Sequence, residues 1–81
     1  MNPLAWLGAA IAVGEVRAAR RALRRCYYVV YLGELSSREH HGMILLEGLG
    51  LVHRDEGLTG LHWHLTDAGR RWVDRPLWGR A

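Results

Sequence analysis

LEGLGLVHRDEGLTGLHWHLTDAGRRW, residues 46–72, contains in order the signals of a helix end, a strand, a turn, a second strand and a capped helix. The helical pattern ends at Gly48 and Gly50, and the β-branched Val52 begins a strand. Few arrangements are compatible with this order. We therefore predict a helix that leads directly into a β-hairpin and then a short closing helix.

The hairpin and the closing helix each have a local signature. Residues 61–65, LHWHL, alternate apolar and polar side chains, which is the period of a half-buried strand. Two glycines within residues 55–60 permit the reversal between the strands. Thr66 can cap the last helix, and Asp67 lies in its first turn, where the helix dipole favours a negative charge. We predict that this helix runs to about Asp74.

The length of 81 residues fits a single domain, residues 1–81, that buries only ~60% of its unfolded surface. Self-association would stabilise such a domain, so we expect a homodimer. The single cysteine, Cys26, excludes an intrachain disulfide and a CxxC metal site, and we expect a cytoplasmic location. Residues 4–13 are apolar but about half the ~20 residues that a membrane span needs, so we expect no transmembrane helix or signal peptide.

The charge balance favours an acidic partner. The net charge is +3, the sequence pI is near 9.8, and all eleven basic residues are arginine. These values do not distinguish nucleic acid, a membrane surface and a protein. We attribute the absence of lysine first to the coding bias of a GC-rich genome and second to selection for bidentate recognition.

The first thirty residues predict a long helix. Pro3 is a favourable first residue, and nothing forces a stop before about Leu32. At about 100° per residue, an apolar stripe forms on one side and a basic stripe of roughly 140° on the other. The apolar stripe consists of Ala5, Ala9, Ala12, Val16, Leu23, Tyr27 and Val30. The basic stripe, the arginine ridge, consists of Arg17, Arg20, Arg21, Arg24 and Arg25.

The arginine ridge is a candidate binding surface. A run of charges is usually a solvated helix face. Here only Glu15 lies nearby to offset five like charges, which repel one another at i, i+4 spacing. We therefore weigh a binding role for the ridge equally with simple solvation.

Residues 27–31, YYVVY, could be the end of the first helix or a strand, because aromatic and β-branched residues favour strands. If they are helical, the turn lies at residues 32–35 and the second helix opens at Ser36 with a capping box. In that motif the Ser36 hydroxyl accepts from the backbone of Glu39, whose carboxylate reaches back. This helix runs to about Leu49. It is expected to turn three residues to the core, Met43, Leu46 and Leu49.

Three segments carry a resemblance to a known family. LSSR at 35–38, LEGLGLV at 46–52 and HLTDAGR at 64–70 resemble the recognition helix, the wing and the closing helix of MarR-type and PadR-type winged-helix regulators. The resemblance implies an α+β, mostly α fold with a long N-terminal helix or helices, a second helix, a two-stranded β-wing and a short C-terminal helix. It also implies that the helix opening at Ser36 enters the major groove of DNA and that the wing tip lies over a phosphate backbone.

The charge map disagrees with DNA binding at this surface. Recognition needs cations for phosphates and donors for base edges. Around the second helix, Arg38 is the only arginine against three glutamates, Glu34, Glu39 and Glu47. At the wing tip, Arg54 is followed by Asp55 and Glu56. Because a fold does not determine a function, we give the charge map slightly more weight.

The histidines raise the question of a metal site. His62 and His64 lie on one side of a strand and could share a zinc ion with His53 across the hairpin. No fourth ligand is indicated, and a solvated strand face explains these histidines more simply. We therefore expect no metal and no cofactor.

Catalysis is not expected. The candidate nucleophiles are Cys26 with a histidine, or Ser36 and Ser37 beside His40, and none belongs to a catalytic motif. Ser36 is better explained as a helix cap.

The four tryptophans divide into two pairs. Trp63 and Trp72 fit the core between the wing and the closing helix. Trp6 and Trp78 lie near the termini, where a small domain covers them poorly, so we assign them to an oligomer or partner interface.

Together these patterns predict a non-enzymatic protein-binding module that docks the arginine ridge, with Trp6 and Trp78, on an acidic, partly apolar surface of a larger host protein. In size, arginine-only basicity and domain type, the chain resembles the small early proteins of Mu-like phages, which include inhibitors of host machinery such as the pilus-extension ATPase. The alternative is a winged-helix DNA-binding transcriptional regulator. It would dimerise through the first helix and bind DNA with Ser37, Arg38, His41 and Arg54.

Overall fold

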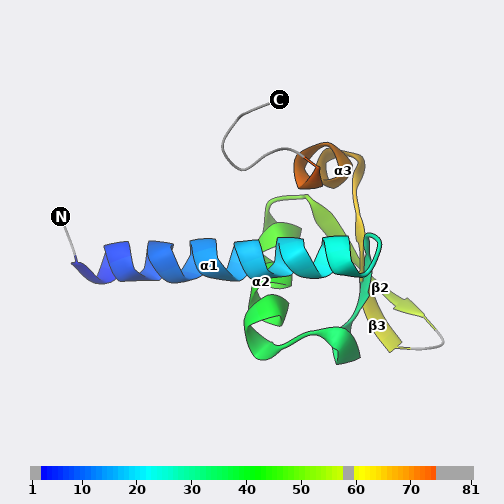
Figure 1. Cartoon of the computed structure of the whole chain (residues 1–81), viewed down its shortest axis with the longest axis horizontal. Helices are drawn as coiled ribbons and strands as arrows, with labels where there is room; N and C mark the ends of the chain where they lie inside the picture. The colour runs from blue at the N-terminus through cyan, green and yellow to red at the C-terminus, as the bar shows by residue number, and fades with distance from the viewer. Residues whose placement is uncertain (1–2, 58–59, 75–81) are drawn as a thin grey trace.

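The computed structural model describes the backbone of residues 3–57 and 60–74, and the side chains of these ranges from Leu7 onward. The elements in chain order are α1 (Pro3–Arg25), β1 (Val29–Tyr31), the 3-10 turn η1 (Leu32–Glu34), α2 (Ser37–Gly48), β2 (Val52–Gly57), β3 (Gly60–Leu65) and α3 (Asp67–Val73). Within the described residues, three α-helices and a three-stranded antiparallel sheet form a mostly helical α+β domain with a winged-helix-like layout (Figure 1). The predicted fold class is confirmed, with one strand more than expected.

The additional strand comes from residues that the sequence left ambiguous. The strand order is β1-β3-β2, and Val30 and Arg54 face Trp63 of β3 from either side. The predicted hairpin is present as β2 and β3, and of the two alternatives for residues 27–31 the strand is correct, at Val29–Tyr31; the default expectation of a helix to about Leu32 is wrong. The element directly before α2 is the short η1 turn. In a helix-turn-helix this position is occupied by a full helix.

Two tyrosines in the left-handed region end α1 early. Tyr27 has a φ of 56° and Tyr28 a φ of 73°, a conformation that costs a non-glycine residue about 1–2 kcal/mol. The Tyr28 amide donates to the Leu23 carbonyl at 2.7 Å, and its hydroxyl donates to Asp74 Oδ1 at 3.0 Å. These bonds and the pairing of β1 with β3 offset the cost, so the chain turns back onto the sheet.

Small residues let α1 and α2 pack closely. A Cβ on Gly42 of α2 would meet the carbonyl group of Glu15 and lie 2.8 Å from the methyl group of Ala19. The α1 residues that are buried are Ala18, Ala19, Arg20, Ala22 and Leu23. The predicted apolar stripe is correct at Leu23 but wrong at Ala9 and Tyr27, which are exposed. The N-terminal half of α1 extends beyond the other elements (Figure 1).

The core lies between the helices and one face of the sheet. Trp63 is fully buried among other apolar side chains, which include Leu23, Val30, Met43, Leu46, Val52 and Val73. The predictions for Trp63, Met43 and Leu46 are confirmed, and Trp72 packs partly buried against this core. The prediction for Leu49 is wrong, because it caps the C-terminus of α2 and is 68% exposed.

The closing helix α3 has the predicted N-cap. The Thr66 hydroxyl accepts a hydrogen bond from the Gly69 amide at 3.1 Å and donates one to the Gly50 carbonyl at 2.7 Å. A Cβ on Gly69 would meet the Leu51 carbonyl, so α3 lies directly against the chain that leaves α2. No helix in the described part of the chain is long and apolar enough to cross a membrane.

Replacing Gly42 by alanine tests the close packing of α1 on α2. The added methyl group meets the Glu15 carbonyl, so we expect the free energy of unfolding to fall by about 1–3 kcal/mol. Gly48→Ala in the same helix is the control, because a Cβ there meets nothing within 4 Å and alanine favours helix. Urea unfolding followed by circular dichroism measures both. Equal stability of the two variants would show that the helices do not pack at Gly42.

Candidate functional site

The arginine ridge forms a shallow hollow on α1. Arg17, Arg21 and Arg24 are exposed, and together with Arg20 they line a depression of about 120 Å³. Several guanidinium groups in one depression favour an anion, because arginine binds carboxylates and phosphates in a bidentate manner. We call this feature the arginine hollow.

Arg20 lies at the buried base of the arginine hollow and anchors α3. It is only 6% exposed, and its Nε and Nη2 donate to the Val73 carbonyl at 3.1 and 2.8 Å. Its Cζ lies 5.3 Å from the centre of the Trp72 ring. A guanidinium here also interacts favourably with the negative end of the α3 dipole. The prediction that Arg20 is part of an exposed ridge is therefore wrong.

The electrostatic environment of Arg20 has opposing contributions. Burial lowers the pKa of Arg20, the positive charge of Arg24 lowers it further, and the negative charge of Asp74 raises it. Arginine has so high a pKa that Arg20 stays charged at neutral pH. The base of the hollow is therefore a fixed positive charge.

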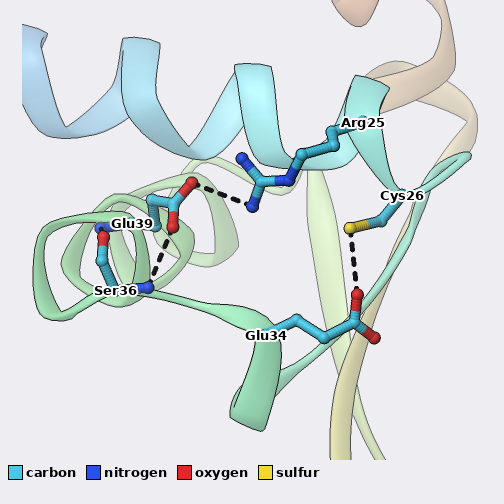
Figure 2. A network of polar contacts seen from close by, with 5 residues as sticks. All are labelled: Arg25, Cys26, Glu34, Ser36 and Glu39. Carbon is cyan, nitrogen blue, oxygen red and sulfur yellow. Dashed lines mark hydrogen bonds and ion pairs between the residues drawn. The ribbon is translucent and has the colours of Figure 1, made fainter.

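Arg25 is not among the residues that line the hollow. Figure 2 shows it reaching from the end of α1 to Glu39 of α2, with Nη2 and Oε2 3.2 Å apart. The other Glu39 oxygen accepts from the Ser36 amide at 2.9 Å, and the Ser36 hydroxyl accepts from the Glu39 amide at 3.2 Å. The predicted capping box is thus confirmed, and Arg25 extends it to α1.

The residue after Arg25 belongs to the same polar network. The Cys26 thiol donates to Glu34 Oε2 at 3.2 Å (Figure 2). Burial raises the pKa of Cys26, and the carboxylate of Glu34 raises it further. The thiol form is therefore favoured, which is the opposite of what a cysteine nucleophile requires.

An apolar groove adjoins the arginine hollow. It has a volume of about 460 Å³ and lies between α1 and the C-terminal end of α2. Its lining includes Val13, Val16, Leu45, Leu49 and Trp72, together with Arg17. Because Arg17 also lines the hollow, the groove and the hollow adjoin at this residue.

Sequence reasoning missed the groove. Leu45 and Leu49 lie one turn apart on α2, and both are exposed, whereas Leu46 between them is buried. The sequence did contain a signal for the groove. The second helix carries apolar residues on more than one face, whereas packing on a single core needs only one apolar face. Trp72 was assigned to the core alone, although it also lines the groove.

Both arginines predicted to bind DNA make contacts within the fold. Arg54 donates two hydrogen bonds to Glu47, both of 3.1 Å, and its Cζ lies 5.7 Å from the Trp63 ring. The Arg38 guanidinium lies against α1, because a Cβ on Gly14 would meet it. Two other predicted residues are exposed on the first two turns of α2, Ser37 and His41; His41 Nδ1 lies 3.8 Å from a Glu15 carboxylate oxygen.

Trp78 lies outside the described residues, as does the Trp6 side chain, so both interface predictions stay predictions. The described residues that could hold a metal ion are Asp55, His62 and His64 on the sheet.

In comparisons with known proteins, no family model, curated protein or solved structure matches the chain.

Replacing Arg20 by methionine tests the anchor on α3. The variant keeps the aliphatic stem but removes both bonds to the Val73 carbonyl. We expect the free energy of unfolding to fall by about 1.5–3 kcal/mol, as for hydrogen bonds made by charged groups. The control is Arg21→Met on the exposed side of α1, for which we expect a change within about 0.5 kcal/mol. Similar small losses of stability in both variants would show that Arg20 does not anchor α3.

Replacing Glu39 by glutamine tests the charged capping box through pH. Hydrogen bonds from Ser36, the backbone bond foremost, and the pairing with Arg25 lower the pKa of Glu39 below its ordinary 4.5. A carboxylate whose folded pKa is lowered stabilises the fold above its unfolded pKa, and the contribution is lost as pH falls through the folded value.

Glu39→Gln keeps a capping side chain but has no charge to lose. At neutral pH we expect it to be less stable than wild type by at most about 1 kcal/mol, and we expect the difference to vanish in acid below the folded pKa of Glu39. Urea unfolding at a series of pH values measures this. The control is the exposed Glu56→Gln, whose free energy of unfolding should follow that of wild type across the pH series. If the free energy of Glu39→Gln also follows that of wild type at a constant offset, the prediction is overturned.

Proposed function

We propose that the chain is a non-enzymatic protein-binding module that holds an acidic, partly apolar segment of a larger protein against α1. The observation that carries this proposal is that Arg17 lines both the arginine hollow and the apolar groove. A ligand with apolar side chains beside carboxylates therefore fits the combined surface better than a purely anionic one.

The charge on α1 supports an anionic contact. Arg24 lowers the pKa of Arg20, which reports repulsion between the two guanidinium groups. A bound carboxylate relieves this repulsion and forms charge-assisted hydrogen bonds with the exposed Arg21 and Arg24.

The groove supports an apolar contact of helical spacing. Its volume of about 460 Å³ is within the usual range of ligand pockets. An amphipathic helix binds such a groove with side chains at i, i+3, i+4 and i+7. An acidic amphipathic helix would insert its apolar side between Val13 and Leu49 and direct carboxylates to the hollow.

The biological setting extends this proposal. We infer a small inhibitor of phage type that acts in the cytoplasm on a host protein, on the resemblance in size, basicity and domain type to early proteins of Mu-like phages. We also infer a homodimer formed along the projecting half of α1, where Leu7 and Ile11 are more than half exposed. Sedimentation velocity of the free protein measures the oligomeric state.

Affinity capture from host lysate, with nuclease present, tests the proposed function. The variant Arg21→Gln/Arg24→Gln removes two exposed charges of the hollow and leaves the Arg20 anchor intact. The matched control, Arg38→Gln/Arg70→Gln, removes two exposed charges elsewhere. We expect one stoichiometric protein, with its affinity lowered at least about tenfold by the first variant and changed little by the second.

The alternative, a DNA-binding regulator, is supported by the winged-helix-like layout and by the exposed first turns of α2. It gives the reverse result in the same experiment. Capture would then retain nucleic acid that nuclease or moderate salt releases, and the variant that includes Arg38 would lose more binding. That outcome would contradict the protein-binding proposal.

A further inference from the structure

Three potential metal ligands converge on the sheet face opposite Trp63. Asp55 of β2 is directly paired with His62 of β3, and His64 is two residues further along the same strand face. Asp55 Oδ2 lies 3.8 Å from Nε2 of His62 and 3.8 Å from Nε2 of His64. The ligand atoms of all three residues lie within 4.8 Å of one another.

His62 is held in place by its surroundings. It is only 9% exposed, so the expectation of a solvated strand face is wrong at this residue. Its ring lies 5.2 Å from the Tyr31 ring, and a Cβ on Gly57 would lie 3.2 Å from its Cε1. The ring therefore packs over the glycine at the end of β2, and its nitrogens are fixed relative to Asp55.

The other ring nitrogen of His62 has a partner that is compatible with a metal ligand. Nδ1 lies 3.4 Å from the Gly60 carbonyl oxygen, which can only accept a hydrogen bond. In the tautomer with its proton on Nδ1, the ring donates this hydrogen bond and Nε2, 3.8 Å from Asp55 Oδ2, carries the lone pair. A metal-binding histidine usually donates its second nitrogen to a carbonyl or carboxylate in this way.

A bound cation can satisfy the three ligand atoms together. Two imidazole nitrogens and a carboxylate oxygen are all acceptors when the histidines are neutral. In a tetrahedral zinc site with bonds of about 2.0–2.1 Å, neighbouring ligand atoms lie about 3.4 Å apart. The two separations of 3.8 Å from Asp55 Oδ2 are within about half an ångström of that geometry, and all three ligand atoms lie within 4.8 Å of one another, so a small side-chain adjustment would bring them around one ion.

His53, the ligand suggested by the sequence, has a different position. Its ring stacks on the His64 ring with centroids 5.1 Å apart and an interplanar angle of 18°. His53 is not among the residues whose ligand atoms lie within 4.8 Å of one another. Asp55 therefore replaces His53 in the ligand set.

We propose that Asp55, His62 and His64 bind one divalent transition-metal ion of the Zn²⁺ class. Imidazole and carboxylate ligands suit this class, and three protein ligands leave the fourth position to water or another donor. The site shares no residue with the arginine hollow or the apolar groove. The metal-site proposal can therefore be tested independently of the proposed function.

Calorimetric titration of the tag-free, chelator-treated protein with ZnCl₂ tests the site. We expect one Zn²⁺ per chain, and we expect Asp55→Asn and His64→Gln each to weaken binding at least about tenfold. His53→Gln, which removes the neighbouring histidine of the same face, is the matched control and should change the affinity less than about threefold. Circular dichroism confirms that each variant is folded.

Nuclear magnetic resonance of the histidine rings gives a second readout. Added Zn²⁺ should shift the ring signals of His62 and His64 and leave those of His40 and His41 on α2 unchanged. The proposal is overturned if the wild-type protein binds no stoichiometric Zn²⁺, if Asp55→Asn and His64→Gln bind it as wild type does, or if His53→Gln loses as much affinity as they do.

Discussion

The close contact of α1 with α2 at Gly42 is the constraint on which the rest of the structure depends. A side chain there would meet the Glu15 carbonyl, so the two helices approach as far as their backbones allow. This approach brings the C-terminal end of α2 beside the middle of α1 and so creates the groove between Val13 and Leu49. It also places the Arg38 guanidinium of α2 against Gly14 of α1.

The arginines of α1 then divide between folding and surface. Arg20 is bonded to the last carbonyl of α3, and Arg25 is bonded to the capping box of α2. Both link segments distant in sequence, in a domain so small that its core alone gives little stability. Arg17, Arg21 and Arg24 are exposed and line the arginine hollow, beside the apolar groove.

Features encoded within a few residues could be predicted, and those set by distant contacts could not. The capping box at Ser36 and the Thr66 cap each depend on residues three apart, and both were predicted correctly. The left-handed Tyr27 escaped prediction because β1 pairing, and not local propensity, stabilises it. Arg20 pairs with a residue 53 positions away, and only the strand register brings Asp55 to the histidines. The sequence therefore indicated the arginines of the hollow, whereas the groove and the position of Arg20 follow only from the packing of the elements.

The central claim is that the surface formed by α1 and the end of α2 holds an acidic, partly apolar partner. Amide hydrogen exchange of the domain, alone and with the captured protein bound, tests it most directly because it maps the footprint on this chain. The account predicts slower exchange confined to the residues around the groove and hollow, 12–24 and 45–49. Slower exchange in the first turns of α2 and in β2, residues 37–41 and 52–57, with α1 unchanged, would contradict it.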